Sequence, residues 1–131
     1  MPHALIEVRR QYSNTAEVAI IDAVHAALVA GFRIPPRDKH IRLVAHEPHR
    51  FAVPPTLTEP EFFTLVSIDC FAGRSLQAKR NLYTEIVDRL AALGIPRDHI
   101  SILVRESETQ NWGIRAGQAA CDIDLGFEVQ V

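Results

Sequence analysis

Apolar residues recur with the spacing of an α-helix in two parts of the chain. Every fourth residue from Ile20 to Leu28 is apolar, which predicts a helix over about 15–30 with one buried face. The same spacing from Leu82 to Leu90 predicts a second helix over about 76–93. Ser13 or Asn14 can cap the start of the first predicted helix and Ser75 that of the second, and a glycine lies near the end of each helix.

Shorter apolar runs predict β-strands. Four of them, at residues 4–8, 41–45, 64–71 and 100–104, flank the two helices, so the order strand–helix–strand occurs twice. At the end of the chain, residues 127–131 alternate apolar and polar side chains, which predicts one further short strand.

The chain contains an internal repeat. Residues 34–41, Ile-Pro-Pro-Arg-Asp-Lys-His-Ile, resemble residues 95–100, Ile-Pro-Arg-Asp-His-Ile, about 60 positions later. The sequence therefore predicts one α+β domain, 1–131, built from two duplicated β-α-β units at about 2–60 and 61–131. Right-handed crossovers would place both helices on one face of a four-stranded mixed sheet.

The opposite face of this sheet has no helix to cover it. The strand at 64–71 carries apolar side chains at neighbouring positions, including Leu65, Val66 and Ile68, and therefore on both faces. A monomer would expose an apolar face to water. We therefore expect this face to pack against other subunits.

Composition excludes several classes of function. The chain has 131 residues, with 14 Lys and Arg against 16 Asp and Glu. The resulting net charge of −2 argues against a dedicated nucleic-acid or anionic-membrane binder. Its apolar runs are interrupted before the roughly 18 residues that a membrane span needs, and no basic-then-apolar leader is visible. Cys70 and Cys121 form no CxxC pair, which is typical of a reducing, cytoplasmic environment.

His46 and His49, with the spacing HxxH, resemble a metal-binding pair. Pro48 lies between them and prevents the helix that a zinc-binding HExxH motif requires, and no third ligand is apparent. We therefore expect no metal site. Four prolines between residues 47 and 60 predict an irregular excursion or a short edge hairpin in this region.

Five stretches of the chain carry a family resemblance: Pro2 with the first strand, residues 21–29, Pro35–Asp38, Gly73–Ser75 and Asn111–Arg115. Together with the repeat, they resemble the tautomerase superfamily of 4-oxalocrotonate tautomerase-like proteins, and within it malonate semialdehyde decarboxylase and its tautomerase relatives. The resemblance implies a homotrimer, no cofactor, and a catalytic proline that removal of Met1 exposes at the amino terminus. It also implies that Pro2, Asp38 and Arg74 are catalytic or bind substrate. Ala72 departs from the pattern, because the decarboxylase carries a second arginine there.

Chemical arguments bear on the same residues. An α-amino group titrates near ~8, so burial and nearby cations can turn a Pro2 amine into a base at neutral pH; otherwise Pro2 merely begins the chain. Arg74, beside a helix start, either binds a carboxylate or is a solvated loop arginine. Asp38 either holds a water or orients the amine, or it bonds its own turn, as expected for Asp98 in the second copy.

Further candidates lie in the last third of the chain. Trp112, Ile114 and Phe127 are candidate walls of an apolar pocket that lowers the pKa of Pro2, or they are plain core. Arg115 is either a second cation for the substrate or a surface charge.

Three functional hypotheses follow. The leading one is a cofactor-free tautomerase, in which Pro2 moves a proton of a 2-keto acid or its enol, Arg74 binds the carboxylate and Asp38 tunes the site. The second is decarboxylation or hydration of a three-carbon oxo acid. The third is a non-catalytic trimeric scaffold or binding protein.

Overall fold

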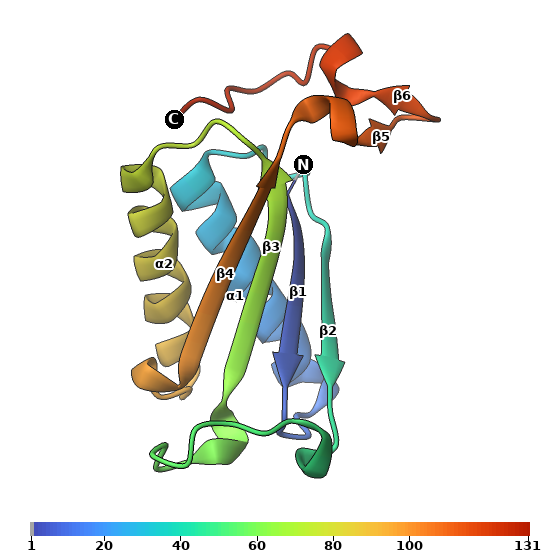
Figure 1. The fold of residues 1–131 in the computed structure, drawn as a ribbon. Coiled ribbons are helices and arrows are strands. Elements are labelled where there is room, and N and C mark those ends of the chain that lie inside the picture. Colours follow the sequence, from blue (N-terminus) through green and yellow to red (C-terminus); the bar gives the residue numbers. More distant parts are fainter. Residues whose placement is uncertain (1) are drawn as a thin grey trace.

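The four strands that flank the predicted helices form one sheet in the computed structural model, which describes residues 2–131. The strands are β1 (His3–Val8), β2 (Ile41–Ala45), β3 (Thr64–Phe71) and β4 (Ile100–Ser107), in the spatial order β2-β1-β3-β4 (Figure 1). β1 pairs in parallel with β2 and β3 in parallel with β4, whereas the central strands β1 and β3 are antiparallel. The predicted α+β fold, with two β-α-β units in a mixed sheet, is confirmed.

Both helices cover the same face of this sheet (Figure 1). α1 spans Asn14–Phe32 and α2 spans Leu76–Ala91. Their starts are fixed by the predicted caps, since Ser13 and Ser75 each accept a hydrogen bond from the backbone N–H three residues later, at 3.2 and 3.1 Å.

The core lies between the helices and the sheet. Every second residue of β1, beginning at Ala4, is fully buried and faces the helices, as the alternation of a half-covered strand requires. α1 and α2 approach each other closely at Gly31, where an added Cβ would lie 2.8 Å from the Cα of Leu82. Glycine at this position therefore sets the spacing of the two helices.

α1 is long and apolar enough to cross a membrane by length and composition alone. Its apolar face includes Ile20, Val24 and Leu28, which are at most 2% exposed and belong to the core. A core helix passes the same test of length and composition, and burial accounts for the apolar character of α1 here.

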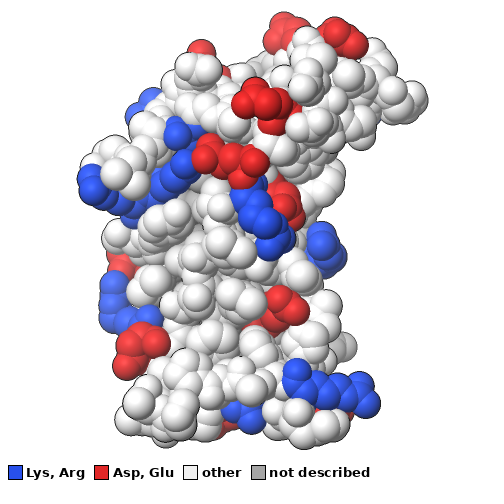
Figure 2. Space-filling model, in the orientation of Figure 1, with Lys and Arg blue, Asp and Glu red and all other residues white. Residues whose placement is uncertain are grey.

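Within residues 2–131, no helix covers the other face of the sheet, as predicted. Leu103 of β4 is 48% exposed and Val44 of β2 is 41% exposed on the strands of this sheet. Figure 2, in the same orientation as Figure 1, shows charged side chains of both signs scattered between broad uncharged areas. The molecule therefore presents a mixed, partly apolar sheet face.

The connections contain short elements only. The structure has 3-10 turns at Pro48–Arg50, Pro60–Phe62, Arg97–His99, Thr109–Asn111 and Ala120–Asp122, and a small hairpin of β5 (Gly113–Ile114) and β6 (Gln118–Ala119). The proline-rich excursion is confirmed, because it forms neither a long helix nor a strand.

The prediction of a strand over residues 127–131 is wrong. This segment is extended but joins no sheet, and it crosses the start of α2 instead. The Val131 carbonyl accepts a hydrogen bond from the Ser75 N–H at 3.0 Å, and a Cβ on Gly73 would lie 3.2 Å from Val129. Gly73, with a φ of 137°, thus makes room for the chain's own last residues.

Candidate active site

Pro2 is buried at one end of the sheet. The following residue, His3, pairs with Asp69 near the end of β3, and Ala4 pairs with Ile41 at the start of β2. Pro2 therefore lies where β2 begins and where β3 leads into the turn before α2 (Figure 1). Removal of Met1 concerns a residue outside the described part of the chain, and it stays a prediction.

Arg74 lies in that turn and is only 5% exposed. Its Cζ is 4.6 Å from the centroid of the Phe32 ring, and its Nη1 donates a 3.3 Å hydrogen bond to the Phe71 carbonyl. Its Nε and Nη2 are buried and have no hydrogen-bond partner among the described residues. The alternative of a solvated loop arginine is therefore wrong.

Burial lowers the pKa of Arg74 from its usual value, against the opposing influence of Cys70 and Glu106. Burial likewise raises the pKa of the Cys70 thiol. A buried guanidinium with two unpaired nitrogens is an incomplete hydrogen-bonding arrangement, and an anionic ligand would complete it.

Asp38 approaches the same end of the sheet from the start of β2. Its side chain is 10% exposed, and its Oδ1 lies 3.3 Å from Nε2 of His40. Asp98, its counterpart in the second copy of the repeat, is 84% exposed and contacts Nδ1 of His99 at 2.7 Å. The two aspartates thus have different environments, and the analogy between them does not explain Asp38.

His3 connects Pro2 to an aromatic cluster. Its ring centroid lies 4.9 Å from that of His40 and 5.2 Å from that of Trp112, which meets it edge-on. Trp112 also contacts Phe71 edge-on at 5.1 Å, and its indole N–H donates to the Ser107 hydroxyl at 2.8 Å. Trp112 therefore lies at the predicted site.

The sequence interpretation missed both histidines. His3 directly follows Pro2, and His40 lies two residues after Asp38, immediately before the neighbouring parallel strand β2. The short distance in sequence from Pro2 and Asp38 could therefore have identified both histidines. Burial lowers the pKa of His3, and positive charge on His40 lowers it further. The Nε2 atom of His3 is buried and unpaired within residues 2–131.

A cavity of about 210 Å³ joins three predicted residues, Asp38, Arg115 and Phe127, with His40. Arg115 is exposed and donates to the Asp124 carbonyl at 3.2 Å. Phe127 packs partly against the core.

The remaining predicted residues do not line this cavity: Pro2, Arg74, Trp112 and Ile114. Ile114 is partly buried in β5. One end of the sheet thus holds Pro2, Asp38, Arg74 and Trp112. Arg115 and Phe127 line the cavity next to Asp38 and form the open side of this end.

No cluster of three or more His, Cys, Asp or Glu side chains suited to a metal occurs within residues 2–131. His46 instead contacts the Glu7 carboxylate at 2.9 Å.

Solved structures share this architecture. That of FG41 malonate semialdehyde decarboxylase, inhibited by 3-bromopropiolate, is 27% identical over 89% of this chain and 92% of the other, with a TM-score of 0.79. Another malonate semialdehyde decarboxylase is 19% identical over 93% and 99%, with a TM-score of 0.83. A native fused 4-OT is 16% identical over 95% and 99%, also with a TM-score of 0.83. The last two likenesses establish the shared fold. No curated protein sequence matches the chain.

A family model described as "Tautomerase enzyme" matches residues 38–115. The matched segment begins at Asp38, contains Arg74 and Trp112, and ends at Arg115, so it includes most of the residues gathered around Pro2. It covers more than half of the 131 residues. The chain belongs to the family of tautomerase enzymes.

Proposed function

We propose that the protein is a cofactor-free enzyme in which the amine of Pro2, freed by removal of Met1, transfers a proton within a 2-keto acid. The observation that carries this proposal is the buried Arg74, whose two unpaired nitrogens lie at the same end of the sheet as the buried Pro2. A guanidinium with two unpaired nitrogens, at the same end of the sheet as an amine that removal of Met1 would free, suits a substrate that has both a carboxylate and an acidic proton.

The reaction needs one base and one anion site. The Pro2 nitrogen takes the hydroxyl proton of the enol, and the O–H electron pair forms the carbonyl. The electrons of the C=C bond then take the proton from the Pro2 ammonium at the adjacent carbon. Arg74 holds the carboxylate and stabilises the negative charge, an effect that is strongest where water is excluded.

Neighbouring groups support this chemistry. Burial of Pro2 beside the His3–Trp112 aromatic contact favours the neutral amine, because desolvation penalises an ammonium ion. Asp38, with His40 at 3.3 Å, orients the amine or the substrate hydroxyl. Arg115 and Phe127 form the open side through which a substrate would enter.

Decarboxylation or hydration of a three-carbon oxo acid is the second candidate. It is favoured by the 27% identity to a malonate semialdehyde decarboxylase over 89% of the chain. In this reaction the protonated Pro2 would serve as an acid and Asp38 would activate water. Ala72 weighs against it, since a second arginine is expected there and Arg74 alone must bind the carboxylate while charge moves into the carbonyl.

The uncovered sheet face supports a homotrimer as the active form. Two fused 4-OT structures that share this fold are described as asymmetric trimers, at TM-scores of 0.81. Packing of the sheet faces of three chains would cover Leu103 and Val44, which a monomer leaves exposed.

A removable amino-terminal extension tests the proposal. Protein with the extension in place has an amide at Pro2 and is expected to fold but not to ketonise phenylenolpyruvate. Cleavage that leaves Pro2 first, checked by mass spectrometry, should restore activity. Assay of the same samples with malonate semialdehyde ranks the two reactions, and faster decarboxylation would favour the second candidate. Equal turnover before and after cleavage would exclude Pro2 as the base, and inactivity of both samples on all keto and oxo acids tested would favour a non-catalytic protein.

A further inference from the structure

The two β-α-β units are related by an internal pseudo-two-fold axis between the antiparallel strands β1 and β3. Thr64 lies 60 positions after Ala4, and these residues pair with Ile100 and Ile41, the first residues of β4 and β2. The two units therefore keep the same strand register. The Pro2 end of the sheet has a structural counterpart at the opposite end (Figure 1).

The residues at the opposite end can be matched to those of the candidate active site. Phe62 lies 60 positions after Pro2, in the 3-10 turn that ends two residues before the start of β3. Tyr12 takes the place of Arg74, because each directly precedes the serine that caps its helix. The second end therefore offers a phenol where the first offers a guanidinium.

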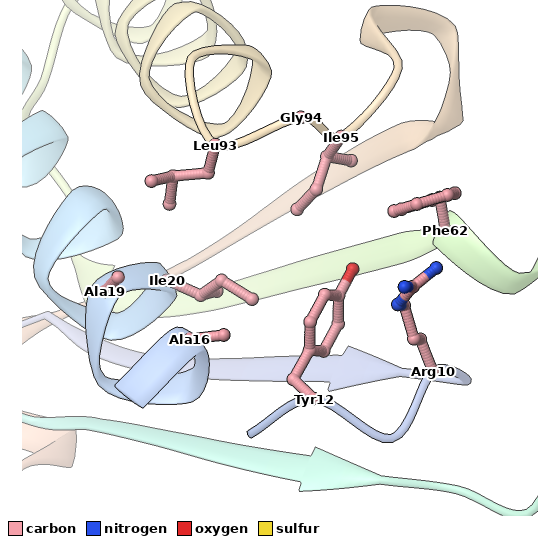
Figure 3. Close-up of a pocket in the computed structure, with 9 residues that line it drawn as sticks. All are labelled: Arg10, Tyr12, Ala16, Ala19, Ile20, Phe62, Leu93, Gly94 and Ile95. Atoms are coloured by element: carbon pink, nitrogen blue, oxygen red, sulfur yellow. The ribbon is translucent and has the colours of Figure 1, made fainter. Parts of the chain in front are cut away.

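A cavity of about 330 Å³ lies at this second end (Figure 3). Its walls are largely apolar and include Ala16, Ala19, Ile20, Leu93 and Ile95. The volume is at the small end of the range of about 300–1,000 Å³ that is typical of ligand pockets. It suits a ligand with one ring or a branched chain.

Polar groups occur on one side of this cavity. Figure 3 shows the Tyr12 hydroxyl beside Arg10, and that hydroxyl oxygen is buried with no hydrogen-bond partner in the described chain. The Arg10 Cζ lies 4.5 Å from the Phe62 centroid and 5.7 Å from that of Tyr12. No carboxylate within residues 2–131 forms an ion pair with Arg10, and Glu61 is the nearby acidic group that acts on Tyr12.

We propose that this cavity is a second binding site, which takes a small monocarboxylate with an aromatic or branched aliphatic body and transfers no proton. Arg10 and the Tyr12 hydroxyl bind the carboxylate, and the apolar walls hold the body of the ligand. A cation and an unpaired donor together favour an anion over a neutral ligand of the same shape. Phe62, inside the chain, has no free amine, so the base of the Pro2 end has no counterpart here.

The site stays accessible in the proposed trimer. Its apolar walls come largely from α1 and from the loop after α2, on the helix-covered side of the sheet, and Arg10, Tyr12 and Phe62 line it at the end of the sheet. The proposed contact between subunits uses the other face. Binding at this site therefore does not depend on whether the chains associate.

Calorimetric titration with phenylacetate tests the proposal. The protein carries Arg74→Met, so that the candidate active site is weakened and its function does not affect the outcome. One phenylacetate per chain is expected to bind, with phenylacetamide bound at least about tenfold more weakly. The fluorescence of Trp112, which lies at the other end of the sheet, should not change on binding.

Substitutions at the second end provide the decisive comparison. Adding Arg10→Gln should weaken phenylacetate binding at least about tenfold, and Tyr12→Phe, which keeps the ring, should weaken it several-fold. Arg80→Gln, on the exposed side of α2, is the matched control and should leave binding unchanged. Binding that is absent, unaffected by Arg10→Gln, equal for the acid and the amide, or accompanied by a Trp112 signal would overturn the proposal.

Discussion

The guanidinium of Arg74 lies on the face of the Phe32 ring, with Cζ 4.6 Å from the ring centroid. Phe32, the last residue of α1, thereby contacts the arginine that directly precedes Ser75, the N-cap of α2. A stacked guanidinium keeps its plane fixed and its edge available for donation. Arg74 is therefore oriented before a ligand arrives, and less entropy is lost on binding.

Replacement of Arg74 should separate activity from stability. Arg74→Met is expected to lower kcat/KM by about 10–150-fold, which corresponds to ~1.5–3 kcal/mol for one charge-assisted hydrogen bond. Its melting temperature should be unchanged or higher, since a buried cation without an anionic partner gives way to an apolar side chain. Arg74→Lys should recover only part of the activity because the planar fork is lost. Steady-state kinetics and thermal denaturation measure both effects, and full activity of Arg74→Met would place the carboxylate site elsewhere, with Arg115 the next candidate.

The association state should depend on the uncovered sheet face. Light scattering of the wild-type protein at micromolar concentration is expected to give a trimer. Leu103→Glu places a charge on that face and should yield monomers, whereas Val18→Glu, at a 55% exposed position of α1, should leave the trimer intact. A stable wild-type monomer would contradict the inferred packing.

The close contact of the helices makes Gly31 sensitive to a single methyl group. Gly31→Ala should lower the free energy of unfolding by about 1–3 kcal/mol, because the added Cβ meets the backbone of Leu82 and the backbone cannot rotate away. Gly113→Ala adds the same group into open space and serves as the control. Urea denaturation compares the two variants, and an unchanged midpoint for Gly31→Ala would show that the helices can move apart without cost.

Stability should fall in mildly acidic solution because of His3. Its pKa in the folded chain lies below the ordinary value of 6.5, mainly through burial and then through positive charge on His40 and Arg42, with Asp38 opposing. Below pH 6.5 the unfolded chain binds a proton at His3 that the folded chain does not, so the free energy of unfolding decreases as pH falls toward the folded-state pKa. Denaturation at a series of pH values should show a smaller decrease for His3→Gln than for the wild type. The exposed His49→Gln is the control, and parallel profiles of His3→Gln and wild type would refute the assignment.

Most of the fold was predictable because local and long-range signals agreed. The four-residue spacing from Ile20 to Leu28, the serine caps and the duplicated turn each favoured the same β-α-β order, which the structure confirms. The exception was residues 127–131, where alternation of apolar and polar side chains predicted a strand. Alternation indicates an extended segment with one buried side, but it does not reveal whether a strand with free hydrogen-bonding groups lies alongside.

The residue types of the site could be predicted from the sequence, but the environment of each side chain could not. A turn before a helix does not reveal burial, because the burial of Arg74 depends on Phe32, more than 40 positions earlier. The difference between Asp38 and Asp98 was hidden for the same reason, since in the repeat both follow the same Pro-Arg pair. Contacts between distant residues decide these environments, and one sequence does not display such contacts.

The hydrogen bond from Ser75 to Val131 has a consequence for synthesis on the ribosome. The turn that contains Arg74 is closed by a residue made 56 positions later than Ser75, and Pro2 from the other end of the sequence lies at the same end of the sheet. The first β-α-β unit can collapse while the rest of the chain is still being translated. The turn that contains Arg74, by contrast, can take this shape only after Val131 has left the exit tunnel.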